Sequence, residues 1–293
     1  MRSTASFTAA WVAGWRGLGD LLGDDQLAAD PFGARFGGRW SRALALAGRR
    51  PPLRDRLVRL GPVANWVGYM QVRTRLFDDA LHDFVTAGGR QIVILGAGYD
   101  CRAARFAIPL GAAGARVWEV DHPATQARKR AVLAELGAAP PVAYVTWDFE
   151  RRPLAELPAE LAAGGLDRAA ATLVLWEGVT MYLSEAAIDA TFAAVRGLGG
   201  PGTRLVFNYL ARSTIDRPRG LERAASLVVR GLGEPFTWGW DPDGLAAWLT
   251  PRAWALAWNR SVDGAAGELL PREVARKVEA AGRYVALAEP RYS

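Results

Sequence analysis

The sequence predicts an α/β fold, in which a mostly parallel sheet is covered by helices on both faces. Three observations support this prediction. Short runs rich in Val, Ile and Leu alternate with helix-like segments, and a glycine-rich loop directly follows the first run. Acidic residues stand at the ends of later runs. Such alternation is typical of parallel strands connected by helices. Because the 293 residues contain no repeat, low-complexity tract or obvious linker, we expect one integrated domain.

The N-terminal part of the chain is predicted to be helical. Apolar residues recur at roughly helical spacing over 65–87, with charged residues between them. The pattern changes after Gly88, where β-branched runs begin. We therefore expect an N-terminal helical cap over residues 1–87, followed by the core of the fold over residues 88–293.

Strands and helices are predicted to alternate along this core. Five strands are expected at residues 91–95, 116–121, 142–147, 172–176 and 203–208. Intervening helices are expected at residues 103–110, 125–136, 154–161 and 185–198. An insertion over about 211–240, helical to about 232, precedes two late strands near 254–258 and 284–288 that flank a helix at 272–281.

The composition argues against several classes of partner. The chain has 36 basic and 30 acidic residues, a net charge of +6, but its arginines are interspersed with Asp and Glu, so we expect no nucleic-acid partner. No run of about 18 uncharged apolar residues is present, so we expect no membrane-spanning helix and no membrane partner. The apolar run around Trp11 is broken by Gly14 and Arg16, which argues against a signal peptide. With only one cysteine, these features favour a cytoplasmic protein, and we expect no metal site.

A glycine-rich loop follows the first predicted strand, with Gly96 and Gly98 separated by one residue. Glycines at this point allow a ligand to approach the backbone where parallel strands end, although a tight turn without a ligand has the same pattern. A dinucleotide-binding loop would have a third glycine at the position of Cys101, and Asp100 would repel a pyrophosphate. The loop therefore fits a cationic, phosphate-free nucleoside better.

Acidic residues stand at the ends of the next two predicted strands. Glu119 and Asp121 lie on one face of the second strand, at the distance from the loop where an acid accepts hydrogen bonds from ribose hydroxyls. A solvated strand end is the alternative. At the end of the third strand, Asp148 is suited to an adenine amino group, with Trp147 or Phe149 against the ring.

Glu177 ends the fourth predicted strand, which is otherwise apolar. A carboxylate in such surroundings needs a compensating charge or hydrogen bonds, because its desolvation costs several kcal/mol. An ammonium or sulfonium ligand would supply that charge. A structural ion pair with an arginine would do the same.

These residues coincide with the motifs of a known family. The chain resembles the leucine carboxyl methyltransferase family of S-adenosylmethionine-dependent enzymes, including its bacterial natural-product branch. The resemblance runs from about Arg73 to Asn208 with the motifs in order. The matching stretches are Val72-Arg73-Thr74-Arg75 with Phe77-Asp78-Asp79, residues 91–106, Glu119-Val120-Asp121-His122-Pro123, and Glu177-Gly178-Val179-Thr180-Met181-Tyr182-Leu183.

The resemblance implies a Rossmann-like class I methyltransferase fold. This fold has a seven-stranded sheet with an antiparallel last strand, N-terminal helices, and an insertion after the fifth strand that covers the pocket. It also implies that S-adenosylmethionine is the cofactor. By position, the implied contacts are Arg73 to the cofactor's carboxylate, Gly96 and Gly98 in the glycine loop, Asp121 to the ribose, Asp148 and Phe149 to adenine, and Glu177 near the methionyl amino group.

The methyl acceptor is predicted to be a carboxylate of a small molecule or a natural-product intermediate, such as a polyketide or peptide. Methyl transfer to a carboxylate needs no general base, and the chain has only two histidines, His82 and His122, neither an obvious base. A phenol or other hydroxyl acceptor stays open. So do a non-catalytic nucleoside-binding protein and a nicotinamide-dependent dehydrogenase.

The acceptor pocket is expected near the predicted insertion, with Tyr182, Trp238 and Trp240 as candidates. Clustered tryptophans are also common in protein cores, so this interpretation has a structural alternative. Cys101 lies near the start of a predicted helix, where the pKa of a thiol can fall. We expect it to be a packed small side chain instead.

Overall fold

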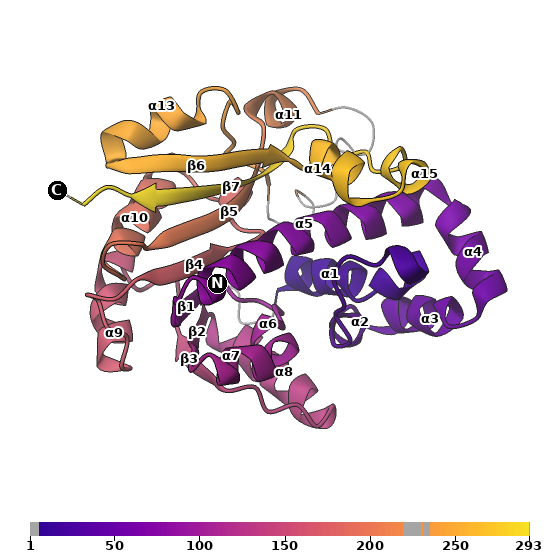
Figure 1. Ribbon diagram of the computed structural model, residues 1–293, viewed down its shortest axis with the longest axis horizontal. Coiled ribbons are helices and arrows are strands. Elements are labelled where there is room, and N and C mark those ends of the chain that lie inside the picture. Colours follow the sequence, from indigo (N-terminus) through magenta and orange to yellow (C-terminus); the bar gives the residue numbers. More distant parts are fainter. Residues whose placement is uncertain (1–5, 219–229, 231–234, 293) are drawn as a thin grey trace.

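The computed structural model, which describes residues 6–218, 230 and 235–292, is built around a seven-stranded sheet (Figure 1). The strands lie in the order β3-β2-β1-β4-β5-β7-β6, and β7 runs antiparallel to both of its neighbours. Their bounds are β1 Gln91–Leu95, β2 Arg116–Asp121, β3 Val142–Thr146, β4 Thr172–Trp176, β5 Arg204–Leu210, β6 Trp254–Ser261 and β7 Arg283–Pro290. The predicted fold class, with its antiparallel last strand, is confirmed.

The central strands β1 and β4 are buried along their whole length. Their side chains alternate between the two faces of the sheet, so Ile92 and Ile94 of β1 join one apolar cluster while Val93 and Leu95 join another. A strand with apolar neighbours on both faces has no polar alternation in its sequence. This double burial explains the continuous apolar runs from which the strands were predicted.

Helices cover both faces of the sheet. One face packs against α5 Gly61–Thr86, α7 Ala107–Ala112 and α14 Val262–Leu269. The other packs against α9 Leu157–Ala163, α10 Glu185–Arg196 and α13 Leu245–Leu249. The sheet therefore forms the middle layer of three.

The N-terminal helices lie beside α5, to the right of most of the sheet in the view of Figure 1. The indole of Trp15 in α1 stacks on that of Trp66 in α5, with ring centroids 6.1 Å apart. The bounds of these N-terminal helices are α1 Phe7–Arg16, the 3-10 helix η1 Gly19–Asp25, α2 Gly33–Phe36, α3 Arg39–Gly48 and α4 Pro51–Arg59. The remaining elements are α6 Arg102–Arg105, α8 Pro123–Glu135, η2 Leu154–Glu156, η3 Thr180–Tyr182, α11 Arg212–Asp216, η4 Thr250–Arg252 and α15 Arg272–Ala275.

Two predicted helices differ from the structure, and one observed helix was not predicted. The helix predicted at 103–110 is divided at Phe106, whose φ of −107° and ψ of 20° are not helical. The helix predicted at 272–281 ends at Ala275. The backbone N–H groups of Lys277 and Val278 bond three residues back, and that of Glu279 donates to Asn65 Oδ1 of α5 at 2.8 Å. The helix α14 was not predicted. Much of the predicted insertion, residues 219–229 and 231–234, lies outside the described residues.

The chain changes direction across the sheet between β1 and β4. From β1 it proceeds outward through β2 to β3, and it then returns to β4 on the other side of β1. In open α/β sheets, ligands bind outside the carboxyl ends of the strands at such a switch point. Within the described residues, no helix is long and apolar enough to span a membrane.

Truncation of a central strand residue should destabilise the fold far more than truncation of the same residue type at the surface. Leu175 of β4 is 0% exposed, so we expect Leu175→Ala to lower the free energy of unfolding by about 2–5 kcal/mol. Leu46 of α3 is 60% exposed, and Leu46→Ala should change it by less than about 0.5 kcal/mol. Guanidinium denaturation measures both, and equal effects would contradict the assigned core.

Candidate functional site

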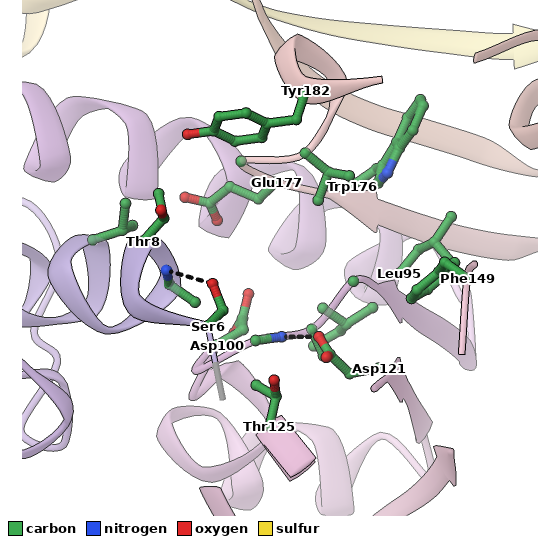
Figure 2. Close-up of a pocket in the computed structure, with 18 of the residues that line it drawn as sticks. Ser6, Thr8, Leu95, Asp100, Asp121, Thr125, Phe149, Trp176, Glu177 and Tyr182 are labelled. Carbon is green, nitrogen blue, oxygen red and sulfur yellow. Dashed lines mark hydrogen bonds between the residues drawn. The ribbon is translucent and has the colours of Figure 1, made fainter. Parts of the chain in front are cut away.

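A cavity of about 500 Å³ opens at the carboxyl ends of three neighbouring strands, at the switch point. The last residues of β1, β2 and β4, Leu95, Asp121 and Trp176, line it (Figure 2). On another side, Ser6 and Thr8 at the start of α1 complete the wall. A cavity of this size is in the range that holds small molecules and cofactors.

The glycine loop after β1 forms part of the cavity wall. Gly96 and Gly98 have φ values of 65° and 49°, which side-chain-bearing residues rarely adopt. A Cβ atom at Gly96 would also lie 3.0 Å from Val179 Cγ2. The loop is attached to β2, because Gly96 N donates to Val120 O at 2.9 Å and Gly98 N donates to Asp121 Oδ2 at 2.5 Å. The glycines are therefore required by the backbone of this loop.

Asp121 is held at the end of β2 with its carboxylate in the cavity. One oxygen accepts the N–H of Gly98, and the other accepts the N–H of His122 at 2.6 Å. Burial raises the pKa of Asp121, and these two hydrogen bonds oppose the rise. Glu119, the other candidate of this strand, does not line the cavity; it pairs with Lys129 Nζ at 2.6 Å, and both side chains are 1% exposed.

Glu177 lines the cavity, and arginines occupy both of its oxygens. Oε1 lies 2.8 Å from Arg73 Nε, and Oε2 lies 2.7 Å from Arg102 Nη1. The structural ion pair that the sequence left open is thus present. The two guanidinium groups hold the pKa of Glu177 well below its usual range, although burial acts in the opposite direction. Glu177 therefore presents a permanent negative charge to the cavity.

Arg73 projects from α5 and also lines the cavity. Its Nε contacts Glu177, and its Nη1 donates to the hydroxyl of Tyr69 at 3.0 Å. Its Nη2 is buried and has no hydrogen-bond partner in the structure. A guanidinium has five N–H donors, and leaving one unpaired in a buried site is unfavourable. An anionic group of a ligand would satisfy it.

The contribution of α1 was missed by the sequence analysis. Ser6 and Thr8 line the cavity, and so does Arg16 near the end of the same helix. Arg16 is fixed by Asp30, with Nε 2.5 Å from Oδ2, and it donates to the backbone oxygen of Tyr99 at 2.5 Å. No signal in the sequence identified α1 as part of the cavity wall, because its residue pattern is that of an ordinary helix.

The segment after β3 contributes one of the predicted adenine contacts to the cavity. Phe149 lines it and is 42% exposed, whereas Trp147 is 0% exposed and belongs to the core. Asp148 is not among the lining residues; its carboxylate accepts the N–H of Glu150 at 3.0 Å and lies 3.4 Å from Arg151 Nε. The hydrogen-bonded turn that begins at Asp148 thus leaves Trp147 in the core and brings Phe149 to the cavity.

Of the three predicted acceptor-pocket residues, Tyr182 lines the cavity. Its ring lies against that of Phe236, with centroids 5.5 Å apart, and burial raises its pKa to about 12. Trp238 and Trp240 do not line the cavity. Trp240 is 3% exposed and packs against Phe207, and Trp238 packs at the edge of the same apolar cluster. The structural alternative, a tryptophan-rich core, holds for these two residues.

Neither histidine lines the cavity. The ring of His82 is exposed beside Asp83, and His122 caps α8 through Nδ1, which accepts the N–H of Ala124 at 3.2 Å. Cys101 is 1% exposed, and burial raises the pKa of its thiol, as expected for a packed side chain. The described part of the chain contains no cluster of His, Cys, Asp or Glu that could hold a metal ion.

A comparison with protein families matches residues 9–196 to the model described as leucine carboxyl methyltransferase. The chain belongs to the leucine carboxyl methyltransferase family. The matched segment runs from α1 to α10, so it includes the glycine loop, Asp121 and Glu177. The part of this methyltransferase that contributes Pro235 to the cavity lies beyond the match.

Curated relatives extend the similarity over most of the chain. A Mycobacteroides abscessus protein is 32% identical over 266 residues, which are 87% of this chain and 85% of the relative. A Streptomyces coelicolor protein is 33% identical over 254 residues, 84% of this chain and 82% of the relative. The names of both assign them provisionally to the S-adenosyl-L-methionine-dependent methyltransferases.

A solved structure has the same fold. The crystal structure of a protein from Thermobifida fusca, provisionally named a methyltransferase, aligns with a TM-score of 0.53 and 18% identity. The alignment covers 95% of this chain and 94% of that one. At this identity the comparison supports the fold, and it extends that support beyond the segment matched by the family model.

The buried state of Cys101 has a measurable consequence. Because the pKa of its thiol is raised, little thiolate is present at pH 8, and the native protein should react very slowly with a thiol-specific reagent. In concentrated guanidinium the chain's single cysteine should react rapidly and completely. Absorbance of the released chromophore measures both rates. Fast stoichiometric labelling of the native protein would show that Cys101 is accessible.

Proposed function

We propose that this protein transfers the methyl group of S-adenosylmethionine to a carboxylate oxygen of a small molecule or a natural-product intermediate, such as a polyketide or peptide. Membership of the leucine carboxyl methyltransferase family supports methyl transfer to a carboxyl group. The names of the relatives support the cofactor. The observation that carries the proposal is the arrangement of charges at the cavity.

The pair formed by Arg73 and Glu177 suits the amino-acid end of S-adenosylmethionine. That end carries an ammonium and a carboxylate on one carbon atom. Glu177 offers a negative charge in the cavity, and Arg73 Nη2 is a buried donor without a partner. The two side chains are in contact, so opposite charges are presented side by side, as a zwitterion requires. The residues present therefore fit this group.

The nucleoside end would occupy the region of the glycine loop. Asp121 can accept hydrogen bonds from the ribose, since each of its oxygens binds one backbone N–H and retains a further lone pair. Phe149, which lines the cavity, would lie against adenine. We assign the cofactor to Arg73, Gly96, Gly98, Asp121, Phe149 and Glu177. Asp148 is left out of this assignment because it does not line the cavity.

A carboxylate acceptor agrees with the ionisable groups of the cavity. No histidine or lysine is among the described residues that line it. Arginines hold the pKa values of Asp100 and Glu177 low, so neither accepts a proton readily. Burial raises the pKa of Asp121, but the backbone N–H groups of Gly98 and His122 bind both of its oxygens, and we assign it to the ribose. Burial raises the pKa of Tyr182 to about 12, so its phenol stays protonated. A phenol acceptor needs a base near neutral pH, whereas a carboxylate arrives already ionised.

The cofactor would supply an electrophilic methyl group on a positively charged sulfur. The chain would hold the acceptor oxygen close to that group and keep water away. Val12, Val179 and Leu183 give the cavity an apolar wall suited to excluding water. Tyr182, a protonated hydroxyl at the same wall, can donate a hydrogen bond to the acceptor. In this mechanism the chain moves no proton.

Replacement of Asp121 should weaken cofactor binding. In Asp121→Asn one oxygen becomes an NH₂ group that faces a backbone N–H, so we expect at least a tenfold loss of affinity for S-adenosylmethionine, about 1.4 kcal/mol. Asp148→Asn is the matched control and should change affinity less than about twofold, because Asp148 does not line the cavity and an amide oxygen can still accept the N–H of Glu150. Titration calorimetry measures both. Equal losses would contradict the site assignment.

The class of acceptor can be read from the product's stability to base. After incubation with cofactor labelled in its methyl group and a panel of carboxylic acids and phenols, we expect labelled products that release volatile methanol in mild base. Methyl esters hydrolyse under these conditions, whereas aryl methyl ethers do not. Base-stable product alone would establish a hydroxyl acceptor instead. A reaction without enzyme controls for spontaneous methylation.

A further inference from the structure

A buried arginine lies directly behind the charged side of the cavity. The side chain of Arg102, the first residue of α6, is 1% exposed and does not line the cavity. Its Nη1 contacts two carboxylates that do: Glu177 Oε2 at 2.7 Å, and Asp100 Oδ2. Its Nε lies 2.8 Å from Asp78 Oδ1 in α5. One guanidinium thus joins α5, the glycine loop and the end of β4.

We propose that Arg102 is a positioning residue, which fixes the carboxylate of Glu177, next to that of Asp100, in the geometry that binds the amino-acid end of the cofactor. This inference rests on the proposed function. It extends that proposal to a residue that would not touch the cofactor. Arg102 would act only through the carboxylate of Glu177.

The shape of the guanidinium is central to this role. Arg102 uses separate nitrogens, in one rigid plane, for Asp78 on one side and for the two cavity carboxylates on the other. A lysine carries the same charge, but as a point charge on a flexible chain it cannot hold three carboxylates in a fixed arrangement. The carboxylates of Asp100 and Glu177 also repel each other, and the shared Nη1 offsets that repulsion.

The neighbouring Arg105 provides a matched comparison. It projects from the same helix and pairs with the same Asp78 through Nη2, and its Nε donates to Ala29 O at 2.5 Å. Its side chain is 6% exposed, so it is nearly as buried as Arg102. It has no hydrogen bond to Asp100 or Glu177 in the structure. The two arginines therefore share a structural role and differ in their contact with the cavity.

The first experiment compares Arg102→Lys with Arg105→Lys in the full-length protein. Titration calorimetry with S-adenosylmethionine, and with its demethylated product S-adenosylhomocysteine, measures affinity. Thermal denaturation monitors folding. We expect Arg102→Lys to weaken both ligands at least tenfold and Arg105→Lys to weaken them less than threefold. Equal changes in the two variants would overturn the proposal.

A double-mutant cycle tests whether Arg102 acts through Glu177. Glu177→Gln removes the charge that Arg102 positions and keeps the shape of the side chain. If the proposal holds, the double variant Arg102→Lys/Glu177→Gln loses far less affinity than the product of the two single losses. Losses that multiply would show that Arg102 supports the fold independently of Glu177, and would overturn the proposal.

The pH dependence of binding gives a readout that loss of stability alone would not produce. Glu177 faces Arg73 of α5, Arg102 of α6, Arg16 of α1 and, as a like charge, Asp100 of the glycine loop. In Arg102→Met one of the three cations that lower the pKa of Glu177 is lost, while Arg73 and Arg16 remain, so we expect this pKa to rise above its wild-type value. We expect the affinity deficit relative to wild type to be larger at pH 5.5 than at pH 8. An equal deficit at both values would contradict the proposal.

A variant of Glu177 tests the same idea if the Arg102 variants do not fold. Glu177→Asp keeps the charge but shortens the side chain by one methylene, so its carboxylate cannot keep both arginine contacts unchanged. We expect at least a tenfold weaker binding of S-adenosylhomocysteine. Wild-type affinity would show that the position of the charge is unimportant. If the wild-type protein itself binds neither ligand, the proposed function fails, and not this inference alone.

Discussion

The cavity depends on the pairing of Glu177 with Arg73 and Arg102. Each of these charges would be strongly unfavourable if buried alone, because removing an ion from water costs several kcal/mol. Paired, they fix one another, since no member can move without leaving a partner uncompensated. These ion pairs connect α5 and α6 to the end of β4. The same contacts therefore hold the two helices in place relative to the strand ends.

In the proposed function, this arrangement would prepare the cavity for a ligand that carries both charges. An amino-acid zwitterion would bring an ammonium and a carboxylate together, so the net charge of the ligand and these side chains would equal that of the side chains alone. The chain has already met the desolvation cost of Glu177 and Arg73 on folding, and few groups need to reorient when the ligand binds. An arrangement fixed in advance also favours selectivity, because a pyrophosphate at the same place would face Asp100 and Glu177.

Much of the sheet and one side of the site could be predicted from the sequence. The central strands β1 and β4 are apolar runs because both faces of the sheet are buried there, and such runs predicted the strand bounds to within a few residues. Residues that directly follow such runs lie at the carboxyl edge of the sheet, so the glycine loop, Asp121 and Glu177 were placed together correctly. The resemblance to the family placed Arg73, which precedes the strands, at the same cavity.

The remaining features depend on contacts between distant residues or on a single turn of the backbone. Glu177 is 104 residues from Arg73 and 75 from Arg102, so no local pattern could choose between an ion pair and a free carboxylate. Trp240 is the last residue of the predicted insertion, but its burial against Phe207 depends on the pairing of its backbone with Ala211, which directly follows β5. After β3, residues only two positions apart in the chain have different surroundings. Trp147 lies in the core and Phe149 lines the cavity, because the backbone turns at Asp148 between them. An aromatic residue in the core and one in a pocket give the same pattern in the sequence. Only the path of the backbone decides which of the two places the side chain occupies.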